Sequence, residues 1–579
     1  MKNINECFSM QNMERLNQAL APLHKQYDQR AKMLTVPFRA FGFFKFLQGI
    51  PVHPTRESLI YAVALLDTDD PGMHQRAVNI IEEILNLQDK NPKSKTYGVW
   101  PKYLEEKPFK ILQPDLNWCD FLATSMLQLI LNHHHHQLSP KMRSKIDDSI
   151  LCAARAIQRR NVPLEYTNIA IMGIYVTLTT GYLYKIDSLY DYALNRLHQF
   201  YDYTIEHGGF NEYNSPTYTI ITLEVLGRLK LHTQNTEAQK LIEALYHLIW
   251  AEIAYRFHPP TFQWSGPHSR SYNTLMESAT LALIERSTSE RIKFGITETH
   301  ATLHENSLPL PCPLDLESFF LHLNEPRTVS QTLLKNIPKQ VLTTYLAPSF
   351  SLGTVNYSDF WHQRRPLIVY WGTPQEPSYL RLRCLYNGVD CAAAQFFSVQ
   401  SEGSVLSGIT FSTNVNPANP YICQNKKHKS KFSIKDLRLR FEFGGLIDVE
   451  SFQARPPTLV SLESELCLYF RGLYIQIQIP YAQFGERIGK WEIHQKSSHC
   501  YLDVVLWSGK RQVFYLSELN QAALGFALQI TTEKPSLSRI AVSTIDDCLG
   551  MRWKNLNLKF SAQPAEQSSL NASMISSNN

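Results

Sequence analysis

The spacing of apolar residues changes once along this chain, and this change restricts the possible folds more than any other feature. Up to about residue 300, apolar residues recur at helical intervals, and Pro, Gly or Asn interrupt the pattern at loop-like distances. The predicted helices are 9–29, 57–67, 74–88, 116–132, 140–160, 167–182, 187–207, 217–232, 236–257 and 270–285. After about residue 345 the period is two, as in 437–443, where Leu or Phe alternates with charged residues. We therefore expect a layered helical domain followed by an antiparallel β-sandwich.

Proline marks the boundary between the two halves. The segment 305–345 contains Pro309, Pro311, Pro313 and Pro326 and is predicted to be a linker. The helical domain then covers 1–304 and the sandwich covers 346–562. The last residues, 563–579, are polar, small and free of aromatic side chains, which predicts a disordered tail.

Charge and cysteine content exclude several classes of function. The 57 Lys and Arg against 52 Asp and Glu leave a net charge of +5 on 579 residues, too dilute for a nucleic-acid surface. The ten cysteines lack zinc-site spacing and are expected to be free thiols of a reducing compartment. The first residues show no Sec signal peptide, and the longest uncharged run, 166–184, is too polar to span a membrane. We expect no metal, no cofactor, and a cytoplasmic protein or one exported without a Sec signal.

A loop in the helical half carries the first candidate binding residues. The segment 208–218 places Glu212, Tyr213 and Tyr218 between two glycines and a predicted helix. Loops held by rigid helices are common places for sites. Turn, capping and packing roles are the structural alternative for the same segment.

A second cluster, 264–272, contains Trp264, His268, Arg270 and Tyr272. If a helix starts at 269, His268 lies at its N-terminal edge. The planar fork of Arg270 suits the carboxylate of an acidic sugar. The alternatives are a cap-region role for His268 and an ion pair between Arg270 and a nearby carboxylate.

A polar residue in an apolar helix and a second basic cluster complete the set. Asn168 lies in a helix that is otherwise apolar, so its amide must find partners, either as an N-cap or as a ligand contact. Trp361, His362, Arg364 and Arg365 precede the first clear strand, at the mouth of the β domain. A lone histidine there is also compatible with a structural role.

Two other motifs carry less weight. The run His133–His136 falls on a helix end, where consecutive side chains splay over different faces and do not converge on one metal. Asp67, Asp69 and Asp70 lack the Gly and Glu spacing of a calcium loop. The sequence also lacks a phosphate-binding glycine loop, a GxSxG elbow and an HExxH motif.

Helices followed by an antiparallel β half, with Asn168, Tyr218 and His362 in that order, resemble the heparinase II/III-like and alginate-lyase-like polysaccharide lyases. The resemblance spans about residues 100–560 in architecture and is specific mainly over 211–218. It implies an (α/α) toroid joined to a β-sandwich, and an acidic polysaccharide or oligosaccharide as substrate. It also implies that Asn168, Tyr218 and His362 are catalytic, with Tyr213 and His268 as substitutes. The expected substrate-binding residues are Glu212, Tyr213, Trp264, His268, Arg270, Tyr272, Trp361, Arg364 and Arg365.

The chemistry of such an enzyme explains this set. β-Elimination removes the proton next to a uronate carboxylate, whose charge must be neutralised as the enolate forms. Asn168 and Arg270 are expected to stabilise that charge, Tyr218 or His362 to take the proton, and a phenol to protonate the leaving oxygen. The scheme requires a positive field that lowers the tyrosine pKa, for which Arg270, Arg364 and Arg365 are the candidates.

Three other functions stay open from the residues alone. A glycan-binding protein would keep the aromatic cleft without an aligned proton-transfer pair. A bacterial effector or scaffold would use the helical surface to bind protein. An (α/α)-toroid glycoside hydrolase would use paired carboxylates, for which Glu165 and Glu212 are candidates.

Overall fold

The chain divides into two compact units, and each unit is assembled from segments that are not contiguous in the sequence. The computed structural model describes residues 10–38, 49–106, 114–132, 137–295, 308–417, 431–445, 465–496, 499–536, 538–545 and 547–570. The helical unit consists of Met1–Ile205, Ile220–Trp250 and Ser278–Leu314. The β unit consists of Glu206–Thr219, Ala251–Glu277 and Asp315–Asn579. Two segments of the helical half therefore belong to the β unit.

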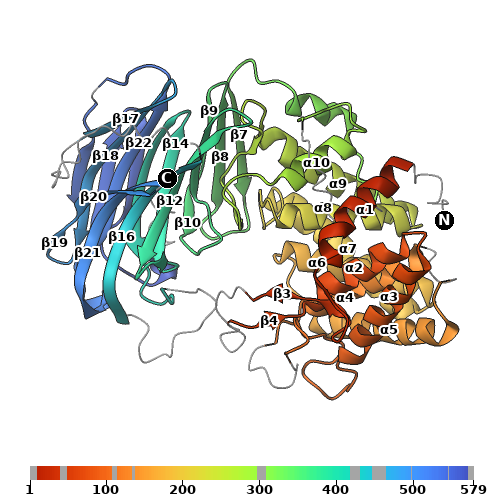
Figure 1. The fold of residues 1–579 in the computed structure, drawn as a ribbon. Coiled ribbons are helices and arrows are strands. Elements are labelled where there is room, and N and C mark those ends of the chain that lie inside the picture. Colours follow the sequence, from red (N-terminus) through yellow and green to blue (C-terminus); the bar gives the residue numbers. More distant parts are fainter. Residues whose placement is uncertain are drawn as a thin grey trace. The chain divides into compact units, whose positions relative to one another are not determined.

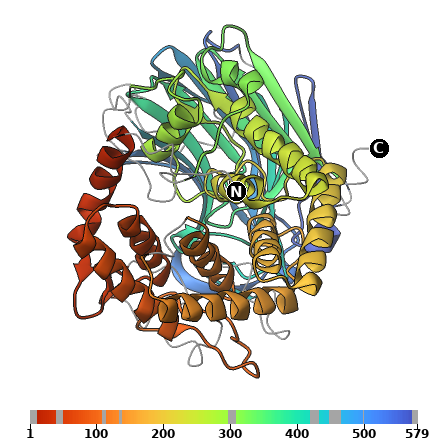
Figure 2. The same ribbon diagram turned by 90° about the vertical axis from the view of Figure 1, so that its right-hand side faces the viewer.

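The helices of the helical unit follow one another along a curved row (Figure 2). The helices are α1 (Met10–His24), α2 (Thr55–Leu66), α3 (Pro71–Leu87), α4 (Trp118–Leu131), α5 (Pro140–Arg160), α6 (Thr167–Leu183), α7 (Asp187–His207), α8 (Tyr218–His232), α9 (Thr236–Arg256) and α10 (Ser278–Ser287). Short two-residue strands lie between them: β1 (Tyr27–Asp28), β2 (Met33–Leu34), β3 (Val36–Pro37), β4 (Pro51–Val52), β5 (Phe257–His258) and β6 (Gln263–Trp264).

Local sequence explains where these helices begin and which one is central. The Asp70 carboxylate accepts a hydrogen bond from the Gly72 amide, and Pro71 occupies the first turn of α3. Ser139 caps α5 in the same way. Helix α6 is buried at every position from Thr167 to Gly181, which explains why its sequence is apolar on all faces.

Besides the short pair β5-β6, the β unit contains two large antiparallel sheets and one three-stranded sheet (Figure 1). The nine-stranded sheet has the order β20-β21-β16-β12-β11-β9-β8-β7, with β13 beside β12, and the seven-stranded sheet has the order β10-β14-β15-β22-β18-β17, with β19 beside β18. Strands β23, β24 and β25 form the third sheet. The bounds are β7 (Arg327–Leu333), β8 (Gln340–Ala347), β9 (Phe350–Val355), β10 (Tyr357–Asp359), β11 (Leu367–Gly372), β12 (Pro377–Tyr386), β13 (Val389–Asp390), β14 (Ala394–Ser401), β15 (Ser404–Phe411), β16 (Lys431–Gly445), β17 (Glu465–Phe470), β18 (Leu473–Phe484), β19 (Arg487–Ile488), β20 (Lys490–Lys496), β21 (His499–Tyr515), β22 (Ala522–Thr531), β23 (Ala541–Ile545), β24 (Cys548–Trp553) and β25 (Leu556–Ser561).

The main core lies between the two large sheets. Phe441 of β16 meets Phe526 of β22 edge to face, with ring centroids 5.2 Å apart. The other face of the seven-stranded sheet is covered by the three-stranded sheet, where Phe397 stacks on Phe560 at 5.8 Å. Because both faces of this sheet are covered, strands such as β22 are apolar almost continuously.

The predicted fold class, helices followed by an antiparallel sandwich, is confirmed, but three boundaries differ. The predicted linker 305–345 contains β7 and most of β8. Side chains of β7 alternate between half-buried and exposed, so polar residues occupy both faces and no apolar alternation marks the strand. In the predicted tail, Leu570 is only 1% exposed because it packs into the core beside the three-stranded sheet. The predicted helix 270–285 is α10, which starts at Ser278.

Two further expectations concern the histidine run and membrane-spanning helices. The run His133–His136 lies outside the described residues. Among the helices that the structure describes, none combines the length and apolar character needed to cross a membrane.

Candidate active site

Backbone hydrogen bonds join three loops of the β unit: 208–218, 264–272 and 360–366. Ser269 N donates to Tyr213 O, Ser271 N donates to Gln363 O, and His268 forms an antiparallel bridge with Arg365. These contacts bring together the three clusters that the sequence had indicated separately.

The second loop lies directly against the backbone of strand β9. A Cβ atom at Gly353 would lie 2.0 Å from the carbonyl of Gly266, so only glycine permits this approach. The position of loop 264–272 is therefore fixed by contact between two backbones.

Arg270 is the centre of the candidate site. Its Nη2 donates to the Tyr218 hydroxyl, its Nη1 to Glu212 Oε1 and its Nε to Gln363 Oε1, each at 2.8 Å. Its Cζ lies 3.9 Å from the centre of the Tyr218 ring and 5.5 Å from that of Trp361. The planar fork of Arg270 holds these three acceptors at once.

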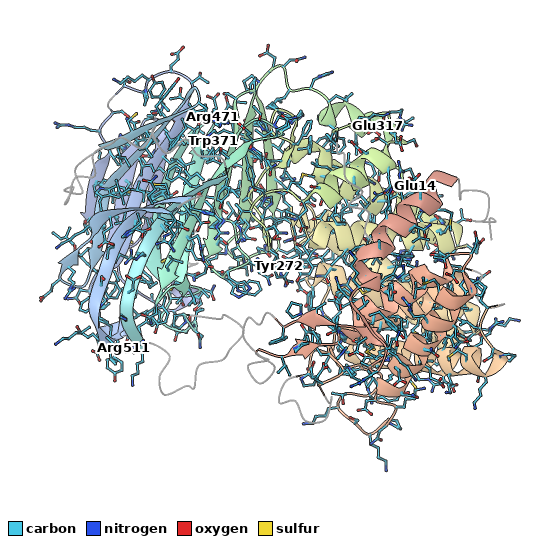
Figure 3. The ribbon with its side chains drawn as sticks, viewed as in Figure 1. Glu14, Tyr272, Glu317, Trp371, Arg471 and Arg511 are labelled. Carbon is cyan, nitrogen blue, oxygen red and sulfur yellow. The ribbon has the colours of Figure 1, made fainter. Side chains whose placement is uncertain are left out.

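The solvent-facing side of this cluster presents two phenols and an imidazole. The Tyr218 and Tyr272 hydroxyls lie 2.9 Å apart, and the Tyr272 side chain, labelled in Figure 3, is 56% exposed. His362 is exposed and packs edge-on against Trp361, with ring centroids 4.7 Å apart. Arg365 Nη1 donates to the His362 carbonyl at 2.8 Å and fixes the backbone there.

Both proton-transfer candidates are neutral in the resting protein. Burial raises the pKa of the Tyr218 phenol above its ordinary value, and the nearby Arg270 guanidinium only partly opposes this. The predicted lowering of the tyrosine pKa is therefore wrong, because loss of hydration outweighs the positive field. Loss of hydration also lowers the pKa of His362, and the charges of Arg365 and Arg270 lower it further against the opposing effect of Asp390.

Three predicted substrate-binding residues form the framework beneath the site. Tyr213, Trp264 and His268 are each 2% exposed. Trp264 Nε1 donates to Asn214 Oδ1 at 2.5 Å, and His268 Nδ1 donates to the Asn214 carbonyl at 2.7 Å. Burial lowers the pKa of His268 to about 3, so its ring is neutral. These side chains are buried and hold the loops together.

Three residues of the 360–366 loop have similar supporting roles. Trp361 is 6% and Arg365 4% exposed. Arg364 Nη1 donates to the Ser269 carbonyl at 2.7 Å, and its Nε lies 3.6 Å from Asp359 Oδ2. These contacts position His362, the exposed member of the loop.

Asn168 and Glu165 belong to the helical unit and not to this cluster. Asn168 is 1% exposed near the start of α6. The N-cap of that helix is Tyr166, so of the two roles left open for Asn168, N-cap or ligand contact, the N-cap is excluded. The proposed carboxylate pair Glu165 and Glu212 is divided between the two units.

Sequence reasoning missed three residues of the site. Gln363 accepts from Arg270, and the Asn214 side chain donates to the carbonyls of Ser265 and Pro267. Arg381 of β12 donates to Thr274 Oγ1 at 2.9 Å, just after the second loop. The alternation of Arg with Leu over 380–383 is a signal that could have placed Arg381 on the outer face of a strand.

The described residues offer no group of three or more His, Cys, Asp or Glu side chains that could hold a metal ion. The eight cysteines within the described ranges are free thiols.

Comparisons with known proteins relate the chain to one family and to several solved structures. The family model of a domain of unknown function (DUF8769) matches residues 14–303, which include two of the three loops. No curated protein matches the chain. Heparinase III is similar with a TM-score of 0.48 and 10% identity, over 97% of this chain and 92% of that chain. The chondroitin AC lyase of Streptomyces coelicolor A3, solved in complex with chondroitin sulphate, has a TM-score of 0.48 and 9% identity, over 96% of this chain and 85% of that chain.

Proposed function

The chain belongs to the family of the domain of unknown function DUF8769, and we propose that it is a polysaccharide-lyase-type enzyme acting on an acidic, uronate-containing glycan. The observation that carries this proposal is the Arg270 cluster. One guanidinium holds the Tyr218 hydroxyl at 2.8 Å, and its charge also acts on the exposed His362. A cation that acts on both a proton donor and a proton acceptor suits a reaction in which negative charge develops.

The protonation states assign the two roles. His362 has a lowered pKa and is neutral at neutral pH, so its imidazole can accept a proton. Tyr218 has a raised pKa and keeps its hydrogen, so it can donate one. Sequence reasoning left the choice of base open between these residues, and their opposite pKa shifts favour His362.

In the proposed reaction, His362 takes the proton from the carbon next to the uronate carboxylate. That C–H bond breaks, a double bond forms to the neighbouring carbon, and the bond from this neighbour to the glycosidic oxygen breaks. Tyr218 donates its proton to the leaving oxygen, and Arg270 stabilises the phenolate that remains. Proton exchange through solvent then returns the imidazolium and the phenolate to their neutral forms.

Neutralisation of the uronate carboxylate is assigned to Arg270, and Asn168 is kept as a separate catalytic candidate. The Arg270 guanidinium keeps a positive charge while it donates to Tyr218, Glu212 and Gln363. Asn168 lies in the helical unit, and its role is a proposal that substitution tests separately. Asn168→Ala should lower turnover without changing the pH at which His362 titrates.

One observation favours a second candidate, a glycan-binding protein without turnover. Tyr272 is 56% exposed beside Tyr218, and open phenol rings of this kind bind sugars without any chemistry. The hydrolase alternative is less favoured, because Glu212 is ion-paired with Arg270 at 2.8 Å whereas a glycosidase needs one protonated carboxyl group.

The test is elimination by the full chain on a panel of alginate, heparan, chondroitin, hyaluronan and pectate. Ultraviolet absorbance reports the unsaturated product, and a reducing-end assay reports any cleavage. Tyr218→Phe is compared with Tyr469→Phe, which removes an exposed phenol from β17.

Absorbance that rises with wild type and with Tyr469→Phe, but not with Tyr218→Phe, is the expected result. New reducing ends without absorbance would identify a hydrolase. Glycan binding without either signal would establish the binding protein.

A further inference from the structure

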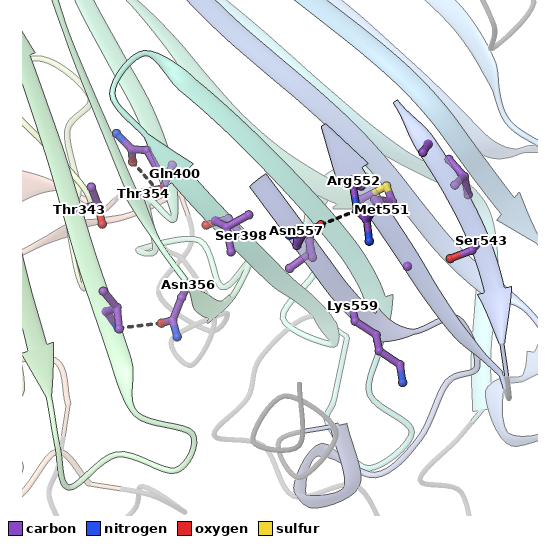
Figure 4. A pocket seen from close by; sticks show the side chains of 16 residues that line it. Thr343, Thr354, Asn356, Ser398, Gln400, Ser543, Met551, Arg552, Asn557 and Lys559 are labelled. Atoms are coloured by element: carbon purple, nitrogen blue, oxygen red, sulfur yellow. Dashed lines mark hydrogen bonds between the residues drawn. The ribbon is translucent and has the colours of Figure 1, made fainter. Parts of the chain in front are cut away.

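A polar groove lies in the β unit, with residues of β8, β9 and β14 on one side and residues of the three-stranded sheet on the other (Figure 4). It has a volume of about 720 Å³. Its sixteen lining residues include Thr343, Thr354, Ser398, Gln400, Arg552 and Lys559. None of them belongs to the Arg270 cluster.

Where strands β9 and β14 reach this groove, the residues on their inner faces change from apolar to polar. Along the inner face of β9, the core residues Phe350 and Leu352 are followed at the same spacing by Thr354 and then by Asn356. Along β14, Phe396 is followed at that spacing by Ser398 and Gln400. A core strand would continue with apolar residues at these positions.

Hydrogen bonds preorganise this polar floor. Thr354 Oγ1 donates to Gln400 Oε1 at 2.6 Å, and Ser398 Oγ donates to the Val355 carbonyl at 2.9 Å. The Asn356 amide accepts from Val341 N at 2.8 Å and donates to the Lys339 carbonyl at 3.0 Å. Hydroxyl and amide groups held in this way suit the hydroxyl groups of a sugar.

The opposite wall carries positive charge. Arg552 of β24 and Lys559 of β25 are exposed, and Arg552 Nε donates to Asn557 Oδ1 at 3.0 Å. The sixteen described lining residues include no Asp or Glu, so the wall has two cations and no balancing acid. An anionic group is the ligand that such a wall favours.

The volume of the groove indicates a ligand larger than a single inorganic ion. At about 30 Å³ for each water, 720 Å³ holds roughly 24 waters, far more than an inorganic anion displaces. We propose that this groove binds an acidic oligosaccharide, with its hydroxyls on the Thr354–Gln400 floor and its carboxylate or sulfate at Arg552 and Lys559. This second site is independent of catalysis, because it shares no residue with the Arg270 cluster.

The test measures binding to full-length Tyr218→Phe, so that turnover does not consume the probe. The probes are an alginate and a chondroitin sulfate oligosaccharide, compared with a neutral maltooligosaccharide and with inorganic sulfate in isothermal titration calorimetry. Arg552→Gln with Lys559→Gln removes the charge of the wall at exposed positions. Lys554→Gln, in the turn between the same strands, is the matched control.

Thr343→Trp tests the floor, because a large ring there would fill the groove beside Thr354. We expect an acidic probe to bind, the double variant to weaken that binding by about tenfold or more, and Lys554→Gln to leave it unchanged. Thr343→Trp should also weaken binding, and added salt should weaken it in all variants that keep the cations.

Three results would overturn the proposal. The acidic probe would bind the double variant as tightly as it binds Tyr218→Phe alone, the neutral maltooligosaccharide would bind as tightly as the acidic probe, or inorganic sulfate would bind and the oligosaccharides would not. Because Tyr218→Phe is expected to keep glycan binding at the Arg270 cluster, the comparison concerns the part of the binding that Arg552→Gln with Lys559→Gln removes and Lys554→Gln retains. Failure of the lyase assay would not affect that part.

Discussion

Removing Arg270 is expected to destabilise the β unit more than removing its acidic partner. Glu212 is 8% exposed, and its carboxylate lies 2.8 Å from Arg270 Nη1. Arg270→Met leaves this buried carboxylate without its cation, which should cost about 3–5 kcal/mol of unfolding free energy. Glu212→Gln keeps an amide oxygen that accepts from Nη1, so its cost should be about 1–2 kcal/mol.

The double variant decides whether this reasoning is right. With both changes no buried charge is left unpaired, so the total cost should be about 2–3 kcal/mol smaller than the sum of the single costs. Urea denaturation followed by tryptophan fluorescence gives the free energies. The chain has two units, so urea can produce two unfolding transitions. Phe441 lies in the core of the β unit, so the transition that Phe441→Leu shifts is the unfolding of the β unit, and its free energy is the one to compare. Single costs that add within about 0.5 kcal/mol would refute a direct coupling between Arg270 and Glu212.

Three further predictions concern protons. Tyr218→Phe should lower elimination at least about a hundredfold while glycan binding persists, whereas Tyr469→Phe should change neither; equal rates for Tyr218→Phe and wild type would remove Tyr218 from the chemistry. Because Arg365 contributes to the lowered pKa of His362, Arg365→Gln should move the acid limb of the kcat/KM profile to higher pH, and an unmoved limb would exclude His362 as the base. Burial raises the pKa of Glu106 to about 7, so its ionisation destabilises the fold as pH rises from about 4 through 7, and Glu106→Gln should gain stability relative to wild type between pH 5 and pH 8 in urea denaturation; a constant difference would contradict this.

The sequence was most informative where one local pattern decided the structure. The alternation over 437–443 predicted β16 because one face of that strand is core and the other is polar. Strand β7 was missed because its residues alternate between half-buried and exposed, so that no apolar face marks the strand. Leu570 was assigned to a tail because a single apolar residue produces no periodic signal, although it is buried in the folded chain.

The candidate site was predicted in its parts but not in its arrangement. The three clusters around Tyr218, Arg270 and His362 were each indicated by their residue types. Which of their side chains face outward depends on long-range contacts, such as the bridge between His268 and Arg365, which no local pattern reveals. The pKa of Tyr218 was misjudged for the same reason, because burial is a property of the assembled fold.

The interleaving of the two units has a consequence for how this protein can change through evolution. The chain crosses between the units after Ile205, Thr219, Trp250, Glu277 and Leu314. A recombination event that exchanged the chain at the Pro-rich segment would separate Tyr218 and Arg270 from His362, although all three belong to one folded unit. The β unit therefore cannot be inherited as one contiguous segment. A gene that keeps the site must also keep the helices of the helical unit that lie between the segments of the β unit.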